Sequence, residues 1–207
     1  MVKMFDSGMP VKDLVAELKT EVDIALEIPD ATYVQWLNYL QQVLYTEVIK
    51  EQKKKVFQPP FENNLIDVSS MAENNENTPI FEDIHAVYAD DTQLIKSTVT
   101  SGVIFRNTFF RITDKLAFNT ENVPEKITII YFVRPALVKP TSHGNISEGV
   151  NVMVPVEFID LVKAKLRGEA YKLANEGELA AMWLNDYNVH LETFKVWIAE
   201  KSPNFGL

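Results

Sequence analysis

Two pairs of adjacent carboxylates are the residues of this chain best suited to catalysis. They are Glu82-Asp83 and Asp90-Asp91. Two carboxyl groups held about 5–10 Å apart can hydrolyse a glycosidic bond, one as the acid and the other as the base or nucleophile. Exposure to water is the usual state of Asp and Glu, and it explains the pairs more simply. A carboxylate-dependent glycan hydrolase is therefore an alternative function and not the leading one.

Other catalytic patterns are missing from the sequence. The three histidines, His85, His143 and His190, lie in different segments, and no H-x-x-x-H or H-E-x-x-H pattern brings two metal ligands together. There is no Cys and no G-x-S-x-G elbow. The glycines Gly144 and Gly149 have P-loop spacing, but Val150 stands where the phosphate-binding Lys would be. We expect no enzyme activity, no cofactor and no metal.

The charge of the chain is unevenly distributed along the sequence. The formal net charge is −9, and the stretch from Val56 to Ile95 contains no Lys or Arg. A base-free stretch can line a surface that repels polyanions or can dock a basic partner. A cytoplasmic module that binds a basic protein is thus a second alternative. The candidate channel or docking acids of this stretch are Glu73, Glu76, Glu82, Asp83, Asp90 and Asp91.

A basic cluster precedes the acidic stretch and consists of Lys50, Lys53, Lys54 and Lys55. We interpret it as the frayed end of a helix, where Lys complements the helix dipole. The longest apolar run, Ile127–Val133, is far shorter than the ~20 residues of a membrane-spanning helix. The first residues lack the apolar core of a signal peptide. These features predict a soluble protein made in the cytoplasm, with no membrane contact.

Apolar residues at helical spacing predict four helices, two at each end of the chain. The first ends before Pro29, and the second runs from about Tyr33 to Glu51. The third begins at Pro155, and Asn175 is expected to cap the fourth. Gly168, inside the third helix, is expected to permit close approach of a neighbouring helix. His190 and Trp197 lie on the broad apolar face of the fourth helix, and Phe205 follows it in a non-helical tail.

The middle of the chain predicts strands and loops. A long loop is expected over 62–79, and short strands over 84–88, 94–99, 103–105, 108–112, 116–118 and 127–133. Helices, then strands, then helices cannot form alternating βαβ units. The predicted fold is α+β, a helical bundle built from both chain ends with an inserted small antiparallel β-sandwich or barrel. The expected divisions are 1–55 and 155–207 for the bundle and 56–154 for the β module.

Several segments, in order, resemble the head–tail adaptor (connector) proteins of tailed bacteriophages. The segment 154–162 is similar to the proline-started helix of that family, and 170–180 to its helix–break–helix. Trp36-Leu37-Asn38 is similar to the start of its second helix. Phe110–Phe118 is similar to its β-hairpin, and Ile129–Phe132 to the strand that follows. The long acidic stretch departs from the compact pattern of the family.

The resemblance implies a structural protein of the virion. Copies of the chain would form a homo-oligomeric ring, typically a dodecamer, at the portal vertex between head and tail. The ring would dock on the portal protein, extend the channel through which double-stranded DNA passes without specific binding, and join a tail protein or a second ring. The portal or subunit contacts expected for it are His190, Trp197 and Phe205.

Overall fold

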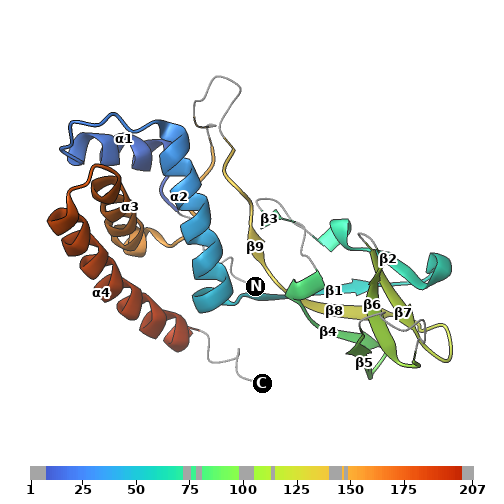
Figure 1. Ribbon diagram of the computed structural model, residues 1–207. Helices are drawn as coiled ribbons and strands as arrows, with labels where there is room; N and C mark the ends of the chain where they lie inside the picture. The colour runs from blue at the N-terminus through green and yellow to red at the C-terminus, as the bar shows by residue number, and fades with distance from the viewer. Residues whose placement is uncertain are drawn as a thin grey trace. The chain divides into compact units, whose positions relative to one another are not determined.

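A computed structural model describes residues 8–71, 76–77, 81–97, 105–112, 115–139, 146 and 149–201, and side chains at 76, 77 and 81 are not described. The chain divides into two compact units, which we describe separately. The helical unit comprises the described residues up to Ile49 and from Leu137 onward. The β unit comprises Lys50–Ala136. Figure 1 shows the elements of both.

The helical unit contains all four α-helices of the described chain. They are α1 (Val11–Glu21), α2 (Asp30–Val43), α3 (Ile159–Leu173) and α4 (Gly177–Lys201). The second helix continues into a π-helical turn, Leu44–Ile49, so the segment expected to be helical to Glu51 ends two residues earlier. α1 ends at Glu21, eight residues before Pro29, so Pro29 does not terminate the first helix as expected and instead stands immediately before α2. A 3₁₀ turn, Val156–Phe158, separates Pro155 from α3.

The tightest helix contact in this unit joins α3 and α4. A Cβ atom placed on Gly168 would lie 2.7 Å from the Cδ2 atom of Leu184 on α4, so a side chain at this position requires Leu184 to shift. The expectation for Gly168 is confirmed. Lys163 and Arg167 of α3 form ion pairs with Glu17 and Glu21 of α1, which tie α3 to its other neighbour.

The link between α3 and α4 differs from the prediction. Asn175 has φ 62°, a left-handed conformation, and its N–H donates to the Lys172 carbonyl. The Glu176 N–H donates to the Tyr171 carbonyl, which completes a Schellman motif. Asn175 therefore closes α3 and is not the N-cap of α4. Asn tolerates the left-handed region better than most residues, which explains its place here.

The described residues between Leu137 and Val154 belong to the helical unit, whereas their sequence pattern predicted a continuation of the β module. The side-chain amide of Asn38 bonds both backbone groups of Val138, at 2.9 and 2.8 Å. The buried Gln41 accepts the Met153 N–H at 2.6 Å. A bridge between Pro10 and Asn151 adds a third tie. Two helix amides and one backbone bridge thus hold this irregular segment, which sequence patterning treated as a continuation of the strands.

The β unit is built from short strands. Its described strands are β1 (Gln52–Phe57), β2 (Leu65–Asp67), β3 (Glu76–Asn77), β4 (Ile84–Ala89), β5 (Thr92–Lys96), β6 (Thr108–Ile112), β7 (Lys115–Asn119), β8 (Ile127–Phe132) and β9 (Arg134–Pro135). Five of the six strands expected from the sequence have counterparts here. The sixth expectation, 103–105, lies outside the described residues except for Phe105. The segment 62–79, expected to be a loop, contributes β2 and β3.

Seven strands form one sheet in the order β1-β8-β4-β5-β6-β7-β2, and it curls on itself as a half-barrel (Figure 1). Every pairing in this sheet is antiparallel except β5–β6, which is parallel, so the expectation of a purely antiparallel module is wrong at that pair. β3 and β9 pair separately. Apolar side chains from the strands and from Met71 fill the inside of the curl, including Val87, Phe109, Ile127 and Ile129.

The basic cluster before the acidic stretch is not a helix end. Gln52–Phe57 is the edge strand β1, and Lys54 and Lys55 lie opposite Ile130 and Ile129 of β8. Three consecutive lysines do not predict a strand from local pattern. β1 forms because β8 supplies its hydrogen-bonding partner. Lysine on an edge strand discourages pairing with another chain.

The fold is therefore mixed α and β, with four helices and a curled seven-stranded sheet in the described residues. None of the described helices combines the length and apolar composition needed to cross a bilayer.

Candidate docking surfaces

The acid pair Glu82-Asp83 separates in the structure into one exposed and one buried residue. Asp83 is buried, and its carboxylate pairs with the Arg134 guanidinium, with Nε to Oδ1 at 2.8 Å. This bond joins the start of β4 to β9. Glu82 is exposed. Asp83 therefore stabilises the β unit and leaves Glu82 as the member of the pair that water and a partner can reach.

The second pair lies at the turn between β4 and β5. Asp90 has φ 52°, and its carboxylate accepts the Lys126 N–H at 3.1 Å. Its own N–H donates to the Lys126 carbonyl at 3.0 Å. Asp90 thus fixes the turn against the segment before β8, while Asp91 is exposed. Asp83 and Asp90 therefore both contribute hydrogen bonds that hold the β unit together.

The two remaining acids of the predicted set are not described to the side chain. Glu73 lies outside the described residues, and Glu76 is described only as backbone in β3. Glu82 and Asp91 are consequently the exposed, described acids of the set.

The β unit combines the acidic stretch with basic residues from the segments on either side of it. The β unit, Lys50–Ala136, has ten Lys and Arg against twelve Asp and Glu, a net charge of −2. The remainder of the chain has ten against seventeen, a net charge of −7. Asp67 of β2 illustrates the cause, because it lies opposite Lys115 of β7. The helical unit, and not the β unit that contains the acidic stretch, carries most of the net negative charge.

The predicted contacts on α4 have described partners within the helical unit. Trp197 stacks on Phe194 at 6.1 Å between ring centroids and meets Phe158 edge to face at 5.1 Å. His190 Nε2 lies 3.6 Å from a carboxylate oxygen of Asp186, one turn earlier. Trp197 therefore packs mainly inside the unit, and His190 lies at its half-exposed margin. Phe205, the third predicted contact, lies outside the described residues.

The opposite face of α4 carries a line of exposed apolar residues. Met182, Val189 and Val196 are 52%, 59% and 59% exposed. They follow one another at intervals of seven residues, the spacing that keeps side chains on one face over several turns. Phe194 and Ile198 are buried on the inner face. We call these three residues the α4 stripe. Its heptad spacing was visible in the sequence, but α4 is apolar on both sides, so only the packing shows which face stays open.

A shallow groove of about 360 Å³ runs beside α2. Apolar atoms come from Ala31, Val34, Leu137 and Val138, and Tyr39 forms one wall. The polar lining consists of amide side chains, those of Gln35, Asn38 and Gln42. We call this the α2 groove. It unites residues about a hundred positions apart, so no local sequence pattern indicates it.

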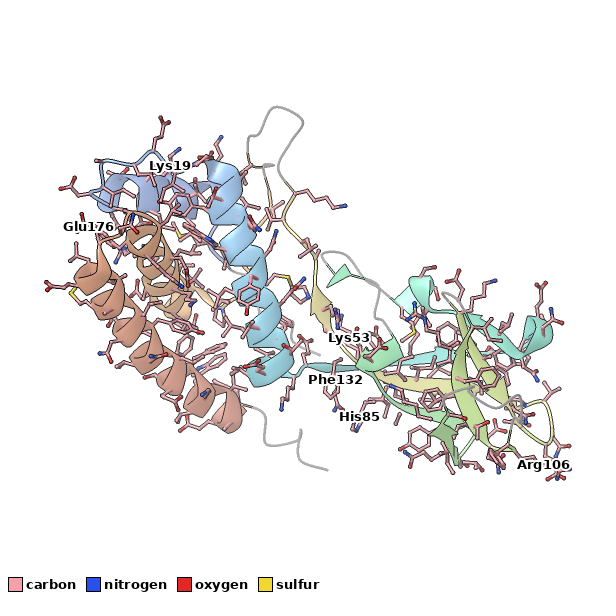
Figure 2. The ribbon with its side chains drawn as sticks, in the orientation of Figure 1. Lys19, Lys53, His85, Arg106, Phe132 and Glu176 are labelled. Carbon is pink, nitrogen blue, oxygen red and sulfur yellow. The ribbon has the colours of Figure 1, made fainter. Side chains whose placement is uncertain are left out.

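The outer face of the sheet carries an aromatic contact between two strands. His85 of β4 and Phe132 of β8 lie side by side (Figure 2), with ring centroids 5.5 Å apart. His85 is exposed and sits at an irregularity where the β4–β8 register shifts. Within the described residues, no three His, Asp or Glu side chains converge as metal ligands would.

Comparisons with known proteins do not connect this chain to a family. No family model matches it, and no curated protein matches it significantly.

Proposed function

We propose that this chain is a structural virion protein, a head–tail adaptor that assembles as a ring on the portal of a tailed bacteriophage. The observation that carries the proposal is the α4 stripe. A long helix with one packed face and a line of three exposed apolar residues among polar ones on its outer face offers a surface against which another helix can lie.

Some of the family-like segments add support, because they fall on helices and strands of the fold, whereas Trp36-Leu37-Asn38 lies in the middle of α2 and not at its start. Pro155 leads into α3, and the break between α3 and α4 lies within 170–180. The segment Phe110–Phe118 spans the antiparallel pair β6–β7. The finer architecture expected for the family, a helical bundle with an inserted sandwich or barrel, belongs to the same proposal, as do the dodecameric ring and the tail-side partner.

The charge of the chain suits a channel through which DNA slides. Affinity for DNA comes mainly from Lys and Arg that neutralise phosphates, so a net negative ring offers the duplex little to adhere to. In this proposal the helical unit, at net −7, supplies most of that repulsion. Glu82 and Asp91, with Glu73 and Glu76, are the acids of the β unit proposed to line or rim the channel.

The test is the location of the protein in purified phage particles. Mass spectrometry should detect the chain in the virion, and electron microscopy with a label on it should place the label on the portal–tail axis. A label elsewhere on the particle, or a virion without the chain, contradicts the proposal. Peptidoglycan hydrolysis by the wild-type protein, lost in the double variant Glu82→Gln, Asp90→Asn, would favour the hydrolase instead.

A further inference from the structure

The curled sheet has an apolar outer face as well as an apolar core. Successive strand residues alternate between the two faces, and Val87, Leu94 and Ile129 belong to the core. The residues between them therefore form the outer face, which the strand register aligns across β1, β8, β4 and β5. We call its apolar side chains the outer sheet face, and they are Val56, Ile130, Phe132, Tyr88 and Ile95.

The charge on this face is positive. The described strands place no Asp or Glu on it, although acids outnumber bases in the chain. Lys54 lies opposite Ile130, and His85 contacts Phe132. Ile95 is 69% and Val56 46% exposed, so water reaches the face. A partner for this surface needs apolar side chains with negative charge beside them.

The α4 stripe has that chemistry. Side chains three or four positions apart are neighbours on a helix. Every Asp and Glu of α4 stands at this spacing from a stripe residue, and these acids are Glu178, Asp186, Glu192 and Glu200. Lys195 also lies beside the stripe, and it pairs with Glu192. The stripe is therefore an apolar line with acidic edges.

These edges disfavour the pairing of one α4 stripe with another. In a parallel pair each carboxylate would meet its own copy. In an antiparallel pair centred on Val189, Asp186 would meet Glu192 and Glu178 would meet Glu200. Like charges placed together at an interface are destabilising, and the outer sheet face offers apolar contact without them. We propose that the α4 stripe of one copy packs on the outer sheet face of a second copy.

The dimensions of the two surfaces agree. The outer sheet face spans three strand spacings, about 14 Å, by four residues of β1, about 13 Å. That area is far below the ~800 Å² per partner of a stable dimer, so two sheets would associate only weakly through it. One helix, about 10 Å wide with its side chains, does fit. The stripe from Met182 to Val196 is about 21 Å long, close to the ~19 Å diagonal of the face.

A single chain leaves both surfaces exposed, so each is available to another copy. The contact is heterologous, because two different surfaces meet, and it repeats from copy to copy and closes a ring if the rotation allows it. One such contact is small, whereas a closed ring contains as many of them as it has copies. The inference deepens the adaptor proposal and rests on it only for the premise that copies associate.

Single engineered cysteines test the contact, because the natural chain has none. Full-length Asn185→Cys, with its thiol beside the stripe, is activated as a mixed disulfide with thionitrobenzoate. It is then added to full-length Gln93→Cys, whose thiol lies on the outer face beside Tyr88. The two reacting groups are on different chains, so only contact between copies accelerates the exchange.

The matched control is Thr92→Cys, at the adjacent exposed residue on the other face of β5. Each rate is divided by that of the same thiol with a small disulfide, which corrects for reactivity. We expect Gln93→Cys to exchange about ten times faster than the control, since docking raises the local concentration of the thiol. Equal corrected rates for the two thiols overturn the inference.

A second variant places a like charge in the contact. Adding Ile95→Asp to Gln93→Cys sets a carboxylate against the acidic edges of the stripe, and the exchange should fall to the control rate. An unchanged rate overturns the inference. Faster exchange between two Asn185→Cys chains would mean that the stripe pairs with itself, and this result also overturns it. Circular dichroism confirms that each variant is folded.

The outcomes separate this inference from the function it rests on. Fast exchange in a protein that is absent from virions would keep the inference and reject the adaptor function. A protein found on the portal–tail axis of the virion but without fast exchange would keep the function and reject the inference.

Discussion

Gly168 of α3 lies directly against Leu184 of α4, where an added Cβ atom would stand 2.7 Å from Cδ2 and 2.8 Å from Cγ of that leucine. Contacts of that length are repulsive, so Leu184 or its helix must move before any side chain fits. The pair fixes how closely the two helices approach. It thereby holds in place the helix that carries the α4 stripe.

Substituting Gly168→Ala should destabilise the protein although alanine is the better helix former. Overpacking costs about 1–3 kcal/mol, and the helix propensity returns about 1 kcal/mol. We therefore expect a net loss of up to about 2 kcal/mol in the free energy of unfolding, measured by urea denaturation. Gly177→Ala is the matched control, because a Cβ there meets nothing within 4 Å. A Gly168→Ala protein as stable as the control would contradict the close packing.

Removing the Asp83 carboxylate should cost stability and not merely surface charge. Asp83 is buried against Arg134, so Asp83→Ala leaves a partly buried guanidinium without that partner. Hydrogen bonds to charged groups contribute about 1.5–3 kcal/mol, and we expect a loss of that order in denaturant unfolding. The adjacent exposed Glu82→Ala should change stability by less than about 0.5 kcal/mol. Equal effects for the two neighbours would mean that the ion pair does not stabilise the β unit.

The α4 stripe should matter for assembly and not for folding. Val189→Asp adds a charge at a 59% exposed position, so the thermal midpoint of the isolated protein should shift little. A charge buried without a partner at a subunit contact is costly, and incorporation into particles should fall at least tenfold. Asn188→Asp, at the neighbouring exposed position, is the control. Normal incorporation of the Val189→Asp protein would exclude the stripe from the interface.

Acid should release the turn after β2. The Asp67 side chain accepts a hydrogen bond from the Ser69 N–H at 2.8 Å. Hydrogen bonds from Ser69, with a smaller contribution from Lys115, lower the pKa of Asp67 below its usual value of 3.8. The charged form is favoured in the folded state, so this contribution to stability is present above the unfolded-state pKa and disappears as the pH falls through the folded one. NMR titration of the wild-type protein should find the midpoint of Asp67 below 3.8. In the Ser69→Pro protein, which lacks the N–H, the midpoint of Asp67 should lie closer to 3.8.

The sequence alone determined the elements that depend on local pattern. Helical spacing and Pro29 and Pro155 located the helices, and β-branched residues located β8, because these signals act within a few residues. The same logic identified Gly168 as a close contact, since glycine inside a helix costs stability and needs a packing reason.

Long-range partners decided what the sequence could not. The lysines of β1 form a strand only because β8 pairs with them, and Asn38 builds the groove only because Val138 returns to α2. Asp83 and Glu82 are chemically alike and adjacent, yet only Asp83 meets Arg134, 51 residues away. Burial and pairing depend on atoms distant in the chain. For that reason the base-free stretch of eight acids belongs to a β unit that is nearly neutral as a whole. Likewise, only the packed fold shows which face of α4 stays exposed.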